Sequence, residues 1–199
     1  ATGLALEGRK VFTYSIANFA TLRCLEQIRN DASYHDANIT IVASGGGFTY
    51  GGLGMSHHAT EDIAIMRALP GIKVIAPCTA WETFHATKAL ANSQGVNYLR
   101  IEKGGDKKPP KKNMKFKIGK AIEMISGKDL SIIATGGILK ECLKASKILS
   151  KIGISAQVVS MHSIKPIDEK FITDCAKKTK KIITVEEHNK IGGLGSAVA

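Results

Sequence analysis

Short apolar segments alternate with helix-like segments along the whole chain, and this alternation restricts the fold more than any other feature. The clearest apolar runs span residues 39–43, 73–76 and 130–134. Each run is bounded by polar or glycine-rich residues and leads into a stretch with helical character. Strands that alternate with helices form parallel sheets with helices on both faces. The sequence therefore predicts an α/β fold.

The expected elements form two groups. The strands are expected at residues 11–15, 39–43, 73–76 and 96–101 in the first group, and at 130–134, 154–160 and 181–186 in the second. The helices are expected at 18–30, from 60 onward, at 79–92, 136–151 and 168–179. We therefore expect two α/β domains, each with a largely parallel sheet and helices on both faces.

Capping residues and apolar spacing set the expected helix boundaries. Asn18 is an N-cap candidate for the helix 18–30, with Leu22, Leu25 and Ile28 facing inward. Thr79 and Glu82 have the spacing of a capping box. Asp168 is the expected N-cap of the helix that ends near residue 179.

A lysine- and proline-rich stretch separates the two groups. We place domains at residues 1–105 and 114–199, joined by a basic linker at 106–113. The net charge of +11 is concentrated in residues 101–199, which contain 20 lysines, 10 acidic residues and no arginine. Because arginine reads bases and aromatic rings stack on them, a half without arginine and with few aromatics argues against nucleic-acid binding. No apolar run approaches the ~18 residues of a membrane span.

The four cysteines are Cys24, Cys78, Cys142 and Cys175. Their separations of 54, 64 and 33 residues do not match the spacing of zinc or redox motifs. We therefore expect no metal site in this chain, and reduced thiols in a cytoplasmic protein.

Glycine clusters follow several expected strands, but none is a familiar nucleotide-binding motif. No stretch fits G-x-G-x-x-G or the phosphate-binding G-K-[ST] pattern. Gly136 and Gly137 lie between a strand and a helix, which suits either an anion site at the helix N-terminus or a simple tight turn.

The segment from Gly45 to Asp62 has the strongest functional pattern. It follows a buried strand, is rich in glycine and contains the adjacent pair His57 and His58. Ligands of open α/β sheets bind at the carboxyl ends of strands. The histidines are therefore candidates for acid–base or hydrogen-bonding work, with helix capping as the alternative.

The chain resembles the C-terminal half of transketolases, in particular the type encoded as a separate section. The resemblance rests on ordered motifs along the whole chain: residues 1–8, 12–19, 23–29, 51–70, Thr184 to His188 and Gly192 to Ser196. Related families with the same architecture are 1-deoxyxylulose-5-phosphate synthase and the pyruvate dehydrogenase beta subunit. The resemblance implies a pyrimidine-binding domain followed by a transketolase C-terminal domain that is truncated at its end.

The resemblance also implies an activity and a set of site residues. The activity is the transfer of a two-carbon ketol unit between sugars or sugar phosphates, with thiamine diphosphate as cofactor. Phe19 would pack on the aminopyrimidine of the cofactor. His57 would be catalytic and, with His58, would contact substrate, while Arg100 would bind a substrate phosphate.

Parts of the family's site are different or missing here. Leu53 and Gly45 stand where the family has an acidic residue and a phosphate-contacting histidine. The family's cofactor-activating glutamate would precede Ala1, and both ends of the chain resemble interrupted helices. The magnesium and diphosphate would be held by another region or subunit, in a homodimer or heterotetramer, and the chain would be inactive without it. The alternatives are a deoxyxylulose-phosphate synthase part or a non-catalytic module that keeps the fold.

Overall fold

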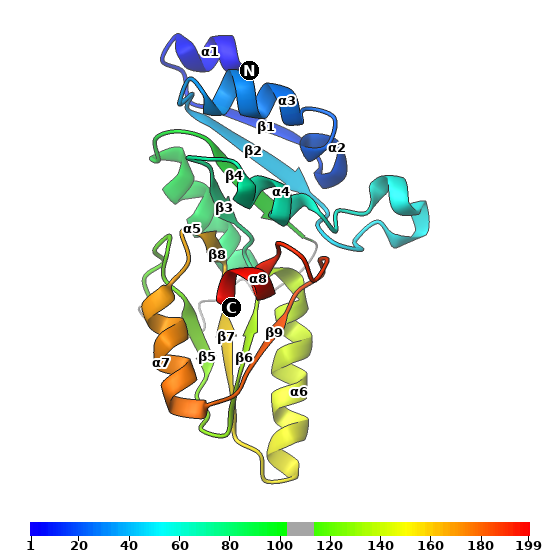
Figure 1. Cartoon of the computed structure of the whole chain (residues 1–199), viewed down its shortest axis with the longest axis vertical. Coiled ribbons are helices and arrows are strands. Elements are labelled where there is room, and N and C mark those ends of the chain that lie inside the picture. The colour runs from blue at the N-terminus through cyan, green and yellow to red at the C-terminus, as the bar shows by residue number, and fades with distance from the viewer. Residues whose placement is uncertain (103–113) are drawn as a thin grey trace.

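The computed structural model describes residues 1–102 and 114–199, and the predicted linker at 106–113 lies outside these residues. The chain forms two mixed, mostly parallel sheets with helices packed against them (Figure 1). The expected α/β class is therefore confirmed. Within the described residues, no helix is long and apolar enough to cross a membrane.

The first sheet has the strand order β1-β2-β4-β3-β8. Neighbours among its first four strands pair in parallel, and β8 pairs with β3 in the antiparallel sense. The strands are β1 (Val11–Ile16), β2 (Ile39–Ser44), β3 (Lys73–Ile75), β4 (Asn97–Ile101) and β8 (Ser163–Lys165). Because the carboxyl ends of parallel strands meet at one edge, the segments after β1, β2 and β4 lie close together.

The helices around the first sheet bury a continuous apolar core. They are α1 (Thr2–Leu6), α2 (Ala17–Thr21), α3 (Leu25–Gln27), the π-helix η1 (Ile28–Ser33), α4 (Asp62–Ala68) and α5 (Ala80–Ala91). Ile63 and Met66 of α4 are fully buried in the same cluster as Ile41 and Val74 of the sheet. Thr79 caps α5 as predicted, because its side chain accepts a hydrogen bond of 3.1 Å from the Glu82 amide. The return bond of the expected capping box goes to the Cys78 amide, which donates to Glu82 Oε2 at 2.6 Å.

The single helix expected at residues 18–30 is wrong. The chain breaks near Cys24 and continues in π-type turns from Ile28, so Leu22, Leu25 and Ile28 do not share one buried face. Leu22 is 49% exposed, whereas Ile28 is buried. Asn18 is not an N-cap either, because its side-chain amide donates to the Ser56 carbonyl at 2.6 Å. A contact between α2 and the glycine-rich loop has replaced local capping.

The second sheet has the strand order β5-β7-β6-β9. Its strands are β5 (Ile122–Ile125), β6 (Leu130–Ala134), β7 (Ala156–Ser160) and β9 (Ile182–Val185), with β5 antiparallel to β7. The helices of this region are α6 (Leu139–Lys151), which follows the 3₁₀ turn η4 (Gly136–Ile138), α7 (Glu169–Thr179) and α8 (Leu194–Val198). Asp168 caps α7 as predicted, accepting a 3.3 Å bond from the Phe171 amide.

Segments from the C-terminal half of the chain also contribute to the first sheet. Strand β8 follows a strand of the second sheet in the chain but completes the edge of the first sheet (Figure 1). Phe116 and Ile118 also pack against a cluster of first-sheet residues that includes Ile75 and Leu99. Segments on both sides of the predicted boundary at residue 114 thus contribute to the packing of the first sheet.

Candidate functional site

The segment between β2 and α4 forms a projecting loop at the carboxyl edge of the first sheet (Figure 1). We call residues 47–59 the glycine loop. An antiparallel bridge closes its base, with Gly47 and Ala59 exchanging backbone hydrogen bonds of 2.9 and 3.0 Å. Two short 3₁₀ turns, η2 (Gly51–Leu53) and η3 (Met55–His57), shape the rest. Gly47 has a φ of +59°, and a Cβ there would collide with Glu187, so this position requires glycine.

The structure brings Phe19 and His57 together. Their ring centroids lie 5.0 Å apart in an edge-to-face arrangement, and the Tyr50 ring lies 6.5 Å from His57. Ser56 Oγ lies 3.0 Å from His57 Nδ1, and the Asn18 bond to the Ser56 carbonyl ties α2 to the loop. Residues from two different strand ends therefore form one aromatic group.

His58 has different neighbours from His57. Its Nε2 lies 3.3 Å from the Gly51 carbonyl oxygen, and its ring packs edge-to-face on Phe48 with centroids 5.2 Å apart. Both histidines are half-buried. The two histidines therefore contact different parts of the glycine loop.

Two neighbours of Phe19 were not predicted as site residues: Arg23 was given no role, and Asn18 was predicted only as a helix cap. The Arg23 guanidinium lies over the Phe19 ring, 3.9 Å from its centroid, and Asn18 bonds the loop as described above. The separation of four residues between Phe19 and Arg23 is the helical spacing that places side chains on one face. Tyr50 was also missed, although an aromatic residue inside a glycine-rich loop was a usable signal.

Arg100 is fully buried at the end of β4. Its Nε pairs with Asp62 at 2.9 Å and its Nη1 with Glu102 at 2.9 Å. Its Nη2 donates to the carbonyl oxygens of Ala59 and Glu187 at 3.0 and 2.9 Å. Burial alone would lower the pKa of this guanidinium, but the Asp62 and Glu102 carboxylates outweigh it, and the pKa is raised. The phosphate-binding role of Arg100 stays a prediction, and protein acceptors take four of its N–H donors.

A glutamate side chain of the same chain occupies the strand-to-helix turn at Gly136 and Gly137. Glu102 accepts a hydrogen bond of 2.6 Å from the Gly137 amide. Glu186 does the same for the amides of Leu194 and Gly195, at 2.6 and 2.9 Å. Backbone amides at such turns favour a negative charge. In this structure that charge comes from glutamate side chains.

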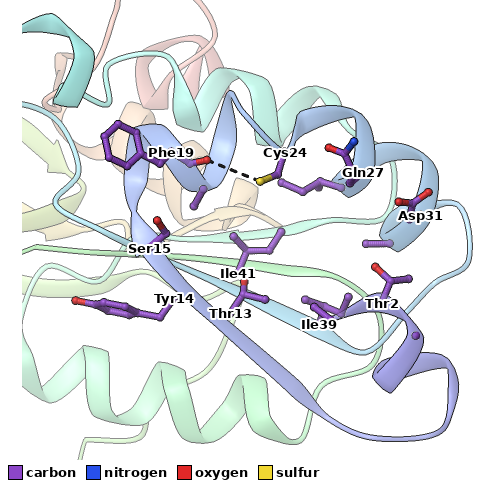
Figure 2. Close-up of a pocket in the computed structure, with 15 residues that line it drawn as sticks. Thr2, Thr13, Tyr14, Ser15, Phe19, Cys24, Gln27, Asp31, Ile39 and Ile41 are labelled. Carbon is purple, nitrogen blue, oxygen red and sulfur yellow. Dashed lines mark hydrogen bonds between the residues drawn. The ribbon is translucent and has the colours of Figure 1, made fainter.

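A cavity with a volume of about 510 Å³ lies between strands β1 and β2 and the helical segments α1, α3 and η1 (Figure 2). It is lined mostly by apolar atoms from β1, β2 and the helical segments between them. Phe19 lies at one end of it, while Cys24, Gln27 and Asp31 lie along the helical side. Neither His57 nor His58 lines it, so Phe19 is the residue shared by the cavity and the aromatic group.

The described residues contain no cluster of histidine, cysteine, aspartate or glutamate that could hold a metal ion. The four cysteines are unpaired, and only Cys24 is exposed. Burial, with Glu82 nearby, raises the pKa of the Cys78 thiol well above its usual value. A thiol in that state is a poor nucleophile.

Comparison with known proteins identifies the family. Residues 1–105 match the transketolase pyrimidine-binding domain, and residues 119–199 match the transketolase C-terminal domain. The chain belongs to the transketolase family. It corresponds to the C-terminal part of such an enzyme, and proteins of this family are transferases.

The similar proteins include separately encoded transketolase subunits. A Methanocaldococcus jannaschii protein provisionally named a transketolase C-terminal section is 44% identical over 202 residues, covering all of this chain and 63% of that protein. One subunit of the apulose-4-phosphate transketolase from Phocaeicola vulgatus is 39% identical over 199 residues, covering all of this chain and 64% of that protein. A solved structure described as a split gene transketolase in an inactive beta4 tetramer superposes with a TM-score of 0.90 at 38% identity, covering 100% of this chain and 64% of that one. The chain thus spans just under two thirds of the length of these relatives.

Proposed function

We propose that this chain supplies the pyrimidine-binding side of a thiamine-diphosphate-dependent transketolase that transfers a two-carbon ketol unit between sugars or sugar phosphates. The observation that carries the proposal is the contact between Phe19 and His57, which join from separate strand ends at the carboxyl edge of the first sheet. Ligands of open α/β sheets bind at this edge.

The residues present fit one half of the cofactor. The half-buried Phe19 ring beside His57 and Tyr50 suits a flat heteroaromatic group such as the aminopyrimidine. The described part of the chain has no metal-ligand cluster that suits a magnesium diphosphate. We therefore assign the diphosphate and magnesium to another region or subunit, which makes this chain inactive by itself.

Each site residue has a separate role in the proposed reaction. Thiamine diphosphate, when bound, supplies the electron sink that allows the carbon–carbon bond of a ketose to break. Phe19 orients the pyrimidine. His57 donates a hydrogen bond to the substrate oxygen on which charge develops, and Ser56 Oγ, 3.0 Å from Nδ1, steadies the imidazole. His58 lies toward Gly51 and Phe48, where it would contact the remainder of the sugar.

The proposed partner is a diphosphate-binding region or subunit, within a homodimer or heterotetramer. The similarity to separately encoded subunits supports this assembly. We place the assembled enzyme in the cytoplasm, where unpaired thiols such as the four found here stay reduced.

The test is ketol transfer by the chain combined with its diphosphate-binding region or subunit, thiamine diphosphate and magnesium. We expect transfer from a ketose phosphate to an aldose phosphate only when all components are present. Transfer by this chain alone would contradict the placement of the site. So would an assembly that transfers equally well without thiamine diphosphate.

A matched pair of variants tests the pyrimidine assignment without measuring turnover. Phe19→Ala should weaken calorimetrically measured thiamine diphosphate binding to the assembly by roughly tenfold, because a stacked ring is lost. Phe84→Ala is the control, since that ring also meets a histidine edge-to-face, at 5.2 Å from His85, but on α5. Equal affinities for the two variants would contradict the assignment.

A further inference from the structure

The Arg100 side chain bonds both the base of the glycine loop and the C-terminal half of the chain. We propose that Arg100 is a positioning residue, which fixes the glycine loop against the segment after β9 and the turn before α6, and so sets the position of His57 and His58. Its effect on catalysis rests on the proposed function, whereas its effect on the loop does not.

The contacts of Arg100 with the loop converge on the closing bridge. The Ala59 carbonyl oxygen accepts from both the Gly47 amide and Arg100 Nη2, at 2.9 and 3.0 Å. The backbone at Gly46 lies so close to the guanidinium that a Cβ there would collide with it. Movement of Arg100 therefore moves the bridge from which the loop projects.

The same guanidinium binds the C-terminal half. Nη2 also donates to the Glu187 carbonyl oxygen at 2.9 Å, so one nitrogen joins the loop base to the segment after β9. Nη1 bonds Glu102, whose other carboxylate oxygen accepts from the Gly137 amide before α6. Two separate segments of the second sheet region are thus attached to the loop base through Arg100.

Asp62 fixes the direction of the guanidinium. Asp62 Oδ2 accepts from Arg100 Nε at 2.9 Å and from the Tyr98 hydroxyl at 2.7 Å, all in the buried interior. A planar guanidinium presents its donors in a fixed fork, which matches four acceptors at once. Lysine would keep the charge but not these directions, so Arg100→Lys separates geometry from charge.

Hydrogen–deuterium exchange of the full-length protein measures the positioning effect directly. We expect Arg100→Lys to speed amide exchange in residues 47–59 by roughly tenfold or more, because local opening becomes easier when buried bonds are lost. Arg67→Lys is the matched control. Arg67 also bonds across the two halves, to the carbonyl oxygens of Gly192 and Gly193, but it does not touch the loop base. Arg67→Lys should leave loop exchange unchanged.

Kinetics of the assembled enzyme separate positioning from phosphate binding. A positioning role predicts that Arg100→Lys lowers kcat by the same factor for a phosphorylated acceptor and for the corresponding free sugar. An increase in KM confined to the phosphorylated acceptor would overturn the proposal and favour a phosphate contact. If the wild-type assembly shows no ketol transfer, the proposed function fails, while the exchange experiment still decides the role of Arg100.

Unchanged loop exchange in Arg100→Lys, or equal effects of Arg100→Lys and Arg67→Lys, would also overturn the proposal. If Arg100→Lys does not fold, Glu102→Gln replaces it, because it keeps the side-chain shape but removes the charge and one of the two oxygens that accept from Arg100 and Gly137. Glu102→Gln should speed exchange at residues 136–139 and, by a smaller factor, in the glycine loop. A loop that exchanges at the wild-type rate in Glu102→Gln would then count against the proposal.

Discussion

The tip of the glycine loop and the buried junction beneath it are built in opposite ways. At the tip, residues 51–56 are exposed, and His57 and His58 make few contacts. At the junction, Asp62, Arg100 and Glu102 form an ion cluster with almost no exposed surface. The difference separates two tasks, since loosely held groups at a sheet edge can meet a ligand while buried bonded groups position them.

The buried polar groups of the junction differ in how fully they are hydrogen-bonded. In the ion cluster four N–H donors of Arg100 are bonded, although Asp62 Oδ1 lacks a hydrogen-bond partner. Three other residues, Glu82, Ser160 and His162, each keep one buried polar atom without a partner. The Phe116 ring packs on His162 with centroids 4.4 Å apart. Because burial shifts the pKa values of His162 and Glu82, the stability of this region should depend on pH.

The largest expected effect is on the ion cluster. Asp62→Ala would leave the buried Arg100 charge without its closest partner and the Tyr98 hydroxyl without its acceptor, which should cost about 3–5 kcal/mol in the free energy of unfolding. Urea denaturation measures this loss. Asp174→Ala is the control, because its ion pair with Lys170 is exposed to solvent and should contribute little to stability. A loss for Asp62→Ala as small as that of the control would remove the distinction between tip and junction.

An intermediate effect is expected from His162. Burial lowers the pKa of His162 from its usual 6.5 to about 4, so the folded protein holds this imidazole neutral. Unfolding below pH 6.5 lets it bind a proton, so its stability contribution is present above pH 6.5 and is lost as the pH falls toward 4.

Between pH 7 and pH 5 this linkage should cost the wild type about 2 kcal/mol more than a His162→Gln variant. Urea unfolding at the two pH values gives both numbers, and the difference between proteins cancels the carboxylates common to both. Parallel losses in the two proteins would show that His162 does not titrate as a buried group.

The smallest effect is expected from Glu82→Gln. Burial raises the pKa of Glu82, so its contribution is present at low pH and is lost as the pH rises through the raised value. Gln keeps an acceptor for the Cys78 amide, which Glu82 holds at 2.6 Å, and adds a donor beside Ser160. The variant should therefore be more stable than the wild type at pH 7 and lose that advantage near pH 4, as followed by thermal melts at both values. A less stable variant at pH 7 would mean that Glu82 is bonded as an ion.

The sequence predicted the central strands well because their apolar runs are long enough to be read locally. It did not predict β8, since three residues, Ser163–Lys165, become a strand only through pairing with β3. The helix expected at residues 18–30 failed for the same reason. There the bond from Asn18 to Ser56, 38 residues away, replaced a local cap.

In the candidate site, too, local features could be predicted from the sequence, whereas contacts between distant residues could not. A glycine-rich loop with two histidines after a buried strand could be recognised from residues 45–62 alone. The partners of Arg100 could not, because Asp62 lies 38 residues away and the Glu187 carbonyl 87 residues away. The role given to Arg100 came from family resemblance, and only the folded chain places its guanidinium among these acceptors.

Turnover and thermal melts of His57→Ala and His58→Ala test the central claim most directly, namely that the loop tip does chemistry while the junction holds it in place. In the assembled enzyme, His57→Ala should lower kcat by about 10²–10³-fold, as expected for a lost hydrogen-bond donor to developing charge. Its melting temperature should change little, because the half-buried imidazole leaves no large cavity. His58→Ala should lower kcat less. Near-normal turnover in His57→Ala, a larger loss in His58→Ala, or unfolding of His57→Ala would contradict the claim.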